Sequence, residues 1–522
     1  MRTDGSRRIT GPHPWLATHG AAIEVEGATA DAVEAWCGAL GRWSATLPWL
    51  GRPFVRRADG HTTLAIEAPI DQLDTAACLL DHVVLGDPVA DTVRTTAAAE
   101  TSPRLCAAWR AAQGPVFLDD EGFTVGVGWG ARTWPLDALP EPDEVRAAVQ
   151  PGAPFVFITG TNGKTTTARL LADIAKAAGH TVGLTSSDAI VIGDDPPDRG
   201  DWTGPGAARR VMRDPRVTLA VLETARGGLM RRGLVAVGAA AALVTNVSAD
   251  HLGEWGLTSL DDLADAKLAI GRGLAPGAPL WVPGGDARIV GRASARDARH
   301  YDRHGPLASV RDGWFHYLGA PLIRLADAPL LLGGAAAFHV DNALAALTLA
   351  GTLGISSEAV RCSLLRFGTP EAPNQGRTER YLWRDRTVIV DFAHNPDGLA
   401  GLLAIARSLG RTVHLLLGQA GDRTDAEILA LAAVARDAAL HRIQLKRLPE
   451  HARTRPVDET VALLKSALEG TSATVADPVG EDEATSAWAA LTASAPGDVI
   501  VLALHEQRDA IVAALQEQPA PS

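Results

Sequence analysis

The sequence predicts an α/β protein of three parts: a central P-loop domain, a smaller doubly wound C-terminal domain, and an α+β N-terminal domain. From residue 155 onward, apolar β-branched segments alternate with helix-forming segments, which is typical of parallel sheets covered on both faces. Within that alternation, a glycine-rich turn ending in Lys164 joins an apolar segment to a helical one. We place the domains at residues 1–150, 151–370 and 371–522.

The N-terminal part mixes short apolar segments with turn residues. We expect helices at residues 33–40 and 73–85, and strands at 62–67 and 117–127. A stretch rich in proline and acidic residues, 136–143, predicts a linker to the next domain. This part holds no catalytic constellation, so its role stays open.

The central part predicts most of the larger sheet. Its expected strands are 155–159, 181–185, 217–223, 240–246 and the short segment 280–282, and its expected helices are 168–178, 260–270, 343–351 and 357–366.

A cluster of Pro, Gly and Asn at residues 368–376 marks the next boundary. Beyond it we expect strands at 387–392, 413–418, 442–448 and 498–504, and helices at 400–409 and 426–439. This alternation indicates the doubly wound C-terminal domain.

Composition indicates a globular cytoplasmic protein. The net charge of −12 argues against a nucleic-acid or anionic-membrane surface, so we expect neither partner. The start of the chain is polar and predicts no secretory signal, and the longest apolar run, 233–244, is shorter than the ~20 residues of a membrane span. Four cysteines without metal-binding spacing indicate thiols of a reducing compartment.

Residues 156–167, VFITGTNGKTTT, predict a phosphate-binding loop. Its glycines let backbone N–H groups approach phosphates at a helix N-terminus, Lys164 reaches the terminal phosphates, and Thr165 is placed to ligate Mg²⁺. The full Walker pattern would put a glycine at Ile158, so the motif is shortened to G-x-x-G-K-T. The alternative is an ordinary turn; the strand before it and the Lys-Thr after it favour binding of a nucleoside triphosphate.

Other candidate residues follow apolar strands, where open α/β sheets place their sites. Glu223 ends one strand and suits Mg²⁺ as a hard oxygen ligand, although a solvated Glu is the alternative. Asn246 ends the next and could face a base or ribose, and His251 could bind metal or phosphate, although a structural role is the commoner one for a lone His. Lys267, by itself, is expected to be a surface lysine.

Further candidates flank the predicted boundary between the second and third domains. Arg377 is expected to meet a γ-phosphate when the domains close, since Arg suits bidentate recognition of phosphate. Asp391 ends an apolar strand and could accept hydrogen bonds from ribose hydroxyls.

Together these motifs resemble the Mur ligase family, and within it the Mur-like half of cyanophycin synthetase. The resemblance runs from about residue 153 to the C-terminus and rests on residues 160–167, 201–205, 222–229, 245–252 and 391–396. It implies that ATP phosphates are held by Gly160, Thr161, Asn162, Gly163, Lys164, Thr165 and Thr166. It also implies a magnesium site served by Thr165, Glu223 and His251, with Lys267 carbamylated to help bind a second Mg²⁺. Asn246 and Asn342 match positions near the nucleotide, and Arg377 and Asp391 match residues of the closing C-terminal domain.

The sequence departs from the family pattern at three points. The family's His-Asn pair is His339-Val340, and its Asp-Tyr-Ala-His-Asn-Pro has Phe392 in place of the tyrosine. Cyanophycin synthetase carries an ATP-grasp module ahead of its Mur half, and we find neither room nor motif for one before Phe155. A separate ATP-grasp protein is therefore a candidate partner.

The resemblance implies an ATP-dependent amide ligase that activates a small-molecule or peptide carboxylate as an acyl phosphate and joins it to an amine. The candidate acceptor is the β-carboxylate of an aspartyl peptide, and the candidate amine is arginine or lysine. Thr203 and Arg226 are candidates for the acceptor side, with a structural role in their loops as the alternative, and His394 and Asn395 are further candidate substrate contacts. Two alternatives stay open: a ligase acting on a cell-wall or folate-like acceptor, and a nucleotide-binding partner subunit without ligase chemistry.

Overall fold

The central sheet positions the candidate site, because the carboxyl ends of its parallel strands lie on the same side. The computed structural model describes residues 2–148, 152–195 and 197–517. Its central sheet has eight strands in the order β11-β10-β9-β12-β8-β13-β14-β15. The bounds are β8 Phe155–Thr159, β9 Val182–Thr185, β10 Ala189–Ile192, β11 Asp198–Arg199, β12 Leu219–Glu223, β13 Ala241–Val244, β14 Leu280–Pro283 and β15 Arg299–Tyr301.

Both faces of this sheet are buried, as the apolar strands predict. In β8, Val156 and Ile158 pack into one hydrophobic cluster, whereas Phe155 and Phe157 pack into the opposite one. Alternate side chains of a strand point to opposite faces, so a strand covered on both sides must be apolar throughout. The covering helices are α6 Lys164–Ala177, α7 Pro205–Arg213, α8 Arg226–Arg232, α9 Leu260–Leu268, α10 Ala287–Ala293, α11 Ala337–Thr352 and α12 Ser357–Arg366.

Two features of the central part differ from the expectation of a parallel sheet. At one edge of the sheet, β10 pairs antiparallel with both of its neighbours, β9 and β11. An antiparallel three-stranded sheet, which the sequence analysis did not predict, also packs against α11 and α12; its strands are β16 Ala308–Arg311, β17 Trp314–Tyr317 and β18 Ala320–Arg324.

The C-terminal domain is a six-stranded sheet in the order β19-β20-β24-β21-β22-β23, parallel except for β19. Helices cover both faces, as two separate hydrophobic clusters show. The strands are β19 Glu379–Trp383, β20 Arg386–Asp391, β21 Val413–Leu417, β22 Arg442–Leu445, β23 Thr474–Ala476 and β24 Val499–Ala503. The helices are α13 Pro396–Leu409, α14 Asp425–Asp437, α15 Val457–Ala467, α16 Glu483–Thr492 and α17 Arg508–Glu517.

The N-terminal part has its own core beneath an antiparallel sheet of order β1-β2-β4-β3. A second small sheet, β5-β6-β7, follows. The strands are β1 Ser6–Ile9, β2 Gly20–Glu26, β3 Phe54–Ala58, β4 His61–Glu67, β5 Val116–Asp119, β6 Gly122–Val125 and β7 Arg132–Trp134. The helices are α1 Ala30–Trp43, α2 Leu73–Leu85, α3 Ala90–Glu100, α4 Pro103–Ala111 and α5 Pro142–Ala148.

One N-terminal prediction, the strand at 117–127, is wrong, and the segment expected as a linker contains short helical elements. The single strand expected at 117–127 is the hairpin β5–β6, because the polar pair Asp120-Glu121 turns the chain before Gly122, whose φ is +140°. The expected linker at 136–143 contains a 3₁₀ turn, Leu136–Ala138, and its end enters α5, since Pro142 suits the first turn of a helix.

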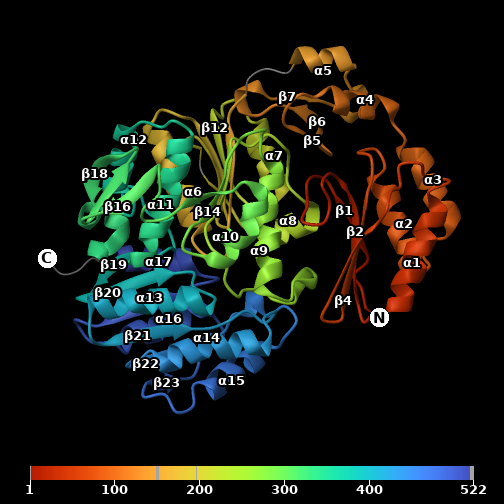
Figure 1. Ribbon diagram of the computed structural model, residues 1–522. Coiled ribbons are helices and arrows are strands. Elements are labelled where there is room, and N and C mark those ends of the chain that lie inside the picture. Colours follow the sequence, from red (N-terminus) through yellow and green to blue (C-terminus); the bar gives the residue numbers. More distant parts are fainter. Residues whose placement is uncertain (1, 149–151, 196, 518–522) are drawn as a thin grey trace.

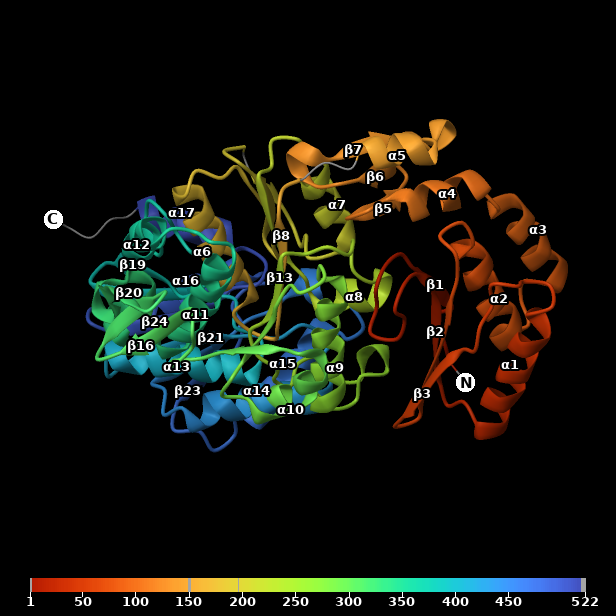
Figure 2. The same ribbon diagram turned by 45° about the horizontal axis from the view of Figure 1, so that its top comes forward.

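The three parts meet around the central sheet. Figures 1 and 2 both show the N-terminal part, in red and orange, on the opposite side of the central domain from α12, and the blue C-terminal sheet stacked below the central domain in Figure 1. No helix among residues 2–148, 152–195 and 197–517 has the length and apolar character that crossing a membrane requires.

Candidate active site

The carboxyl ends of neighbouring strands bring the predicted motifs together. Strands β12, β8 and β13 lie side by side, so Glu223, the glycine-rich loop and Asn246 meet at one edge. Strand β9, next to β12, adds the turn Ser186 to Asp188. This is the edge at which open α/β sheets bind ligands.

The glycine-rich loop is held in shape by the end of β13. Asn246 accepts a hydrogen bond from the backbone N–H of Asn162 at 2.9 Å and donates one to the Asn162 carbonyl at 2.8 Å. Thr245 Oγ1 donates to the same carbonyl at 2.6 Å. Gly160, at φ +152°, packs so closely that a Cβ there would lie 1.8 Å from Thr245 Oγ1. The amide of Asn246, expected at a base or ribose, is instead bound to the loop itself.

Helix α6 begins directly at the end of this loop. Gly163 precedes it in the left-handed region, at φ +82°, and a Cβ there would lie 2.1 Å from Oδ1 of Asn342. The first N–H groups of a helix have no partner within it and carry partial positive charge. Lys164 lies back across the loop, its Nζ donating to the Thr161 carbonyl at 2.8 Å. The loop thus offers backbone donors, a helix N-terminus and a cation.

Glu223 and Thr165 form a pair of oxygen groups beside the loop. Thr165 Oγ1 donates to Glu223 Oε1 at 3.2 Å and lies 2.9 Å from the Ser187 hydroxyl. Glu223 is buried, and burial raises its pKa, while the charges of Lys164 and Arg377 act against that rise. Among the described residues, no cluster of three or more His, Cys, Asp or Glu side chains is arranged to hold a metal.

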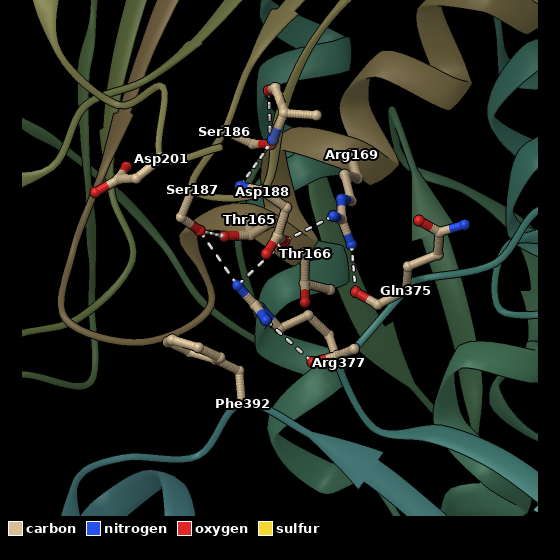
Figure 3. A network of polar contacts seen from close by, with 12 residues as sticks. Thr165, Thr166, Arg169, Ser186, Ser187, Asp188, Asp201, Gln375, Arg377 and Phe392 are labelled. Carbon is tan, nitrogen blue, oxygen red and sulfur yellow. Dashed lines mark hydrogen bonds and ion pairs between the residues drawn. The ribbon is translucent and has the colours of Figure 1, made fainter. Parts of the chain in front are cut away.

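A second cluster beside the loop centres on Asp188, which the sequence analysis missed (Figure 3). Three arginines reach its carboxylate: Arg169 of α6 at 2.7 Å, Arg377 at 3.2 Å and Arg508 of α17 at 3.4 Å. Burial alone would raise the pKa of Asp188, but these arginines hold it below its usual range. Because Arg377 and Arg508 belong to the C-terminal domain, this carboxylate joins the two domains.

Arg377, which the sequence predicted as a site residue, makes several contacts where the two domains meet. Its Nη2 donates to the Ser187 hydroxyl at 3.2 Å, and its guanidinium lies 5.0 Å from the ring of Phe392. The phenylalanine that stands where the family has tyrosine therefore makes a cation–π contact with the guanidinium of Arg377. Asp391, expected at a ribose, accepts from the backbone N–H of Thr378 at 2.6 Å, and burial raises its pKa.

Two asparagine side chains also join the domains. Asn395 caps α13 by accepting from the N–H of Gly398 at 2.9 Å, ahead of Pro396 at the first helical position. Its Nδ2 also donates to Oδ1 of Asn162 in the loop, at 2.9 Å. Asn374, in the predicted boundary region, donates to Thr166 Oγ1 at 3.1 Å.

His251 lies in a loop beyond β13, and Arg226 begins α8, which follows β12. Arg226 donates through Nη1 to the His251 carbonyl at 2.6 Å, and both side chains also contact Glu254. His251 at φ +55° and Trp255 at φ +57° lie in the left-handed region, which costs a residue with a side chain about 1 kcal/mol or more.

Lys267 is buried, which corrects the expectation of a surface lysine. Its Nζ donates to the Gly160 carbonyl at 2.8 Å, behind the glycine-rich loop. Burial, together with the charge of Lys164, lowers the pKa of Lys267 well below its ordinary value. Burial in this position favours the neutral form of the amine more than exposure at the surface would.

A cavity of about 890 Å³ collects most of the predicted site residues in its wall. These are Thr161, Asn162, Gly163, Lys164, Thr165, Thr166, Thr203, Glu223, Asn246, Asn342, Arg377, Asp391 and His394. Thr203 donates there to Asp201 Oδ1 at 2.7 Å. Five predicted residues are outside the wall: Gly160, Arg226, His251, Lys267 and Asn395.

The cavity also contains a buried histidine whose titration affects stability. Burial lowers the pKa of His339 to about 3; its ring lies within hydrogen-bonding distance of Asn342 and Thr378. The unfolded chain binds a proton near pH 6.5 and the folded chain does not, so stability falls as pH drops from about 6.5 toward 3.

We therefore expect wild-type protein to lose more stability between pH 7 and 5 than His339→Gln, by up to about 1.4 kcal/mol per pH unit. Urea denaturation at several pH values measures this. Parallel pH profiles for the two proteins would contradict the assignment.

Family models match the two domains that build this cavity. Residues 158–350 match the Mur ligase middle domain, and residues 376–503 match the Mur ligase glutamate ligase domain. Cyanophycin synthetase of Synechocystis sp. is 34% identical over 301 residues, which cover 54% of this chain and 34% of that protein. UDP-N-acetylmuramoyl-L-alanyl-D-glutamate–2,6-diaminopimelate ligase of Rhizobium meliloti is 29% identical over 296 residues, 52% of this chain and 57% of that protein. The chain thus spans about a third of the length of the cyanophycin synthetases it matches.

Solved structures share the fold. E. coli FolC in complex with DHPP and ADP superposes with a TM-score of 0.53 at 21% identity, covering 70% of this chain and 89% of that one. MurF from Acinetobacter baumannii superposes with a TM-score of 0.50 at 19% identity, covering 70% of this chain and 77% of that one.

Proposed function

Because residues 158–350 and 376–503 make this chain a member of the Mur ligase family, we propose that it is an ATP-dependent ligase that joins a carboxylate to an amine. One observation carries the proposal: Lys164, Glu223 and the C-terminal domain's Arg377 line a single cavity. A phosphate-binding loop that faces an arginine of a second domain suits transfer of a phosphoryl group within a closed cleft.

The residues present fit a nucleotide and a magnesium ion. Close packing against Thr245 and Asn342 leaves no room for a Cβ at Gly160 or Gly163, and it holds the loop at the N-terminus of α6, where helices bind phosphates. Thr165 and Glu223 would hold Mg²⁺ through hard oxygen atoms, and the ion would neutralise phosphate charge. Structures of the same fold, such as E. coli FolC in complex with ADP, support a nucleotide here.

In the proposed reaction, a carboxylate oxygen of the acceptor attacks the γ-phosphorus of ATP. The bond from that phosphorus to the β–γ bridging oxygen breaks, giving an acyl phosphate and ADP. The amine nitrogen then attacks the acyl carbon, phosphate leaves with the bonding electrons, and the nitrogen loses a proton to solvent. Lys164 and Arg377 offset the charge on the transferred group, and the contacts between domains exclude water from the acyl phosphate.

The finer assignments are also proposals. An aspartyl-peptide carboxylate as acceptor and arginine or lysine as amine are supported by the similarity to cyanophycin synthetase. Aspartates in the cavity wall, including Asp286, Asp302 and Asp397, suit a cationic amine. Carbamylation of Lys267 is supported by its lowered pKa, because only the neutral amine reacts with carbon dioxide. A separate ATP-grasp partner stays a prediction.

The test is to incubate the protein with ATP, Mg²⁺ and a panel of carboxylates and amines, and to identify condensation products by mass spectrometry. We expect one amide and one ADP per turnover, with aspartyl peptides plus arginine or lysine among the active pairs. If cell-wall or folate-like acceptors alone react, the substrate assignment is wrong and the ligase assignment stands. If no pair yields an amide, the ligase proposal fails.

A pair of glycine substitutions tests the nucleotide site separately. Gly163→Ala should weaken binding of ADP at least about tenfold, because its Cβ meets the buried Asn342 and the loop must shift. Isothermal titration calorimetry measures the change.

Gly179→Ala is the matched control. Gly179 has a similar φ, +91°, but a Cβ added there would meet no atom of the described residues within 4 Å. This variant should lose about 1 kcal/mol of stability and keep wild-type affinity. Equal affinity losses in both variants would show that backbone strain, not the crowded loop, is responsible.

A further inference from the structure

The N-terminal domain packs against the central domain at α8, beside the loop that contains His251. Its first hairpin packs on α8: the N–H of Thr10 donates to the Arg232 carbonyl at 2.8 Å, and the N–H of Leu234 donates to the Pro12 carbonyl at 2.8 Å. Figures 1 and 2 both place β1 beside α8. His13, which is buried, makes a further contact of 3.0 Å with the Met230 carbonyl. Neither family model covers this domain.

Two arginines of this domain, Arg7 of β1 and Arg56 of β3, contact the loop formed by residues 250–256, called here the junction loop. The guanidinium of Arg7 lies 4.6 Å from the ring of Trp255, and its Nε donates to the Met230 carbonyl at 2.9 Å. Arg56 donates to the Gly256 carbonyl and forms an ion pair with Asp262, the residue that closes the capping box of α9. The side chains of both arginines are largely buried.

The junction loop depends on outside contacts for its shape. Four of its seven residues have left-handed backbone: His251, Gly253, Trp255 and Gly256. An isolated chain rarely adopts such a succession, so the surrounding groups must fix it. Arg7 and Arg56 hold its far end, at the two residues where the chain turns back toward α9.

Asp250, the first residue of the junction loop, contacts the C-terminal domain. Asp250 lies 3.2 Å from Arg423 Nη1 and 3.6 Å from His394 Nε2. Arg423 is buried and follows β21, and His394 lies in the cavity wall. One short segment therefore contacts all three domains, with Arg226 bound to its middle.

We propose that Arg7 and Arg56 are positioning residues for the ligation reaction, through which the N-terminal domain holds the junction loop so that Asp250 docks the C-terminal domain. The proposal rests on the ligase function proposed above. Neither arginine lines the cavity, so each acts through the loop and not on substrate. The geometry assigns to residues 1–150 a task at the site that the sequence left open.

The experiment measures steady-state ligation by Arg7→Gln, Arg56→Gln and the double variant in the full chain. We expect kcat to fall about 10- to 100-fold, as for other displacements of a catalytic element, while the KM for ATP and the affinity for ADP stay within twofold. Arg94→Gln is the control: Arg94 also stacks on a tryptophan of this domain, Trp43 at 5.3 Å, but does not touch the loop. It should keep wild-type kcat.

A double-mutant cycle separates positioning from a general structural role. If Arg56 acts through Asp250, adding Arg56→Gln to Asp250→Asn should lower kcat by less than about threefold. If the two losses multiply, or if Arg94→Gln loses as much activity as Arg56→Gln, the proposal is overturned.

Amide hydrogen exchange gives a readout that needs no activity. We expect Arg7→Gln and Arg56→Gln to speed exchange in residues 250–256 and in residues 391–396 of the C-terminal domain, while Arg94→Gln leaves both segments protected. Unchanged exchange in both segments would overturn the proposal. Faster exchange in a protein that forms no amide with any substrate pair would leave the structural linkage standing and reject the ligase function instead.

Discussion

Lys164→Ala is expected to lower ATP-dependent ligation by a factor of about 10³ or more. Lys164 follows the loop glycine, and its ammonium donates to the Thr161 carbonyl of the same loop. None of the other described residues in the cavity wall is a lysine that could replace it. Removing one charged donor from a water-excluded phosphoryl-transfer site costs about 10²–10³ in rate, and the loss of phosphate binding adds to that. Initial rates of ADP release at saturating acceptor and amine measure the effect.

Lys176→Ala provides the matched control. It lies on the same helix, α6, where it forms a partly exposed ion pair with Asp194. Because exposed ion pairs contribute little, this variant should retain wild-type rates and stability within about 1 kcal/mol. Substrate-dependent ADP release by Lys164→Ala at near wild-type rates would show that the phosphates bind elsewhere.

The largest effect on stability is expected from Glu483→Ala in the C-terminal domain. The side chains of Glu483 and Lys446 are both fully buried and form an ion pair. Glu483 also accepts from the N–H groups of His505, Glu506 and Gln507, each at 2.8 Å. Removing the carboxylate leaves a buried ammonium without its counter-ion, which costs about 3–5 kcal/mol. Urea denaturation followed by tryptophan fluorescence measures the loss.

An exposed pair in the same domain gives the comparison. Asp477 and Lys465 lie 2.6 Å apart, but more than half of each side chain is exposed. Asp477→Ala should therefore cost less than about 1 kcal/mol. If Glu483→Ala is no more destabilising than Asp477→Ala, the buried pair does not support the fold as described.

The sequence was most informative where burial dictates composition. Strands β8, β12 and β13 are covered on both faces, so each is an uninterrupted apolar run that ends at or just before a polar residue. The sheet β16-β17-β18 lies against one helical layer and is half exposed, with turns every few residues, so its pattern did not stand out. The hairpin β5–β6 resembles one strand in sequence because its apolar residues continue on both sides of a two-residue turn.

The residues of the site could be predicted where they are neighbours in sequence. The glycine-rich loop concentrates its chemistry in seven successive residues, and strand ends pointed to Glu223, Asn246 and Asp391. Asp188 also follows a strand and could have been found by the same rule, but its partners could not: Arg377 and Arg508 are 189 and 320 residues away in sequence. Asp250 likewise meets Arg423 only because two separate domains pack together.

The three arginines that share Asp188 concentrate positive charge on one side of the glycine-rich loop, in a cavity whose wall also holds several aspartates. Arg169, Arg377, Arg508 and Lys164 face two carboxylates, Asp188 and Glu223, and this group of six carries two surplus positive charges in a molecule of net charge −12. That surplus attracts a polyphosphate to this end of the cavity at short range, while the aspartates elsewhere in the wall and the net charge of the chain repel it. Added salt screens the distant repulsion before it weakens the near attraction, because the Debye length at 0.15 M is about 8 Å.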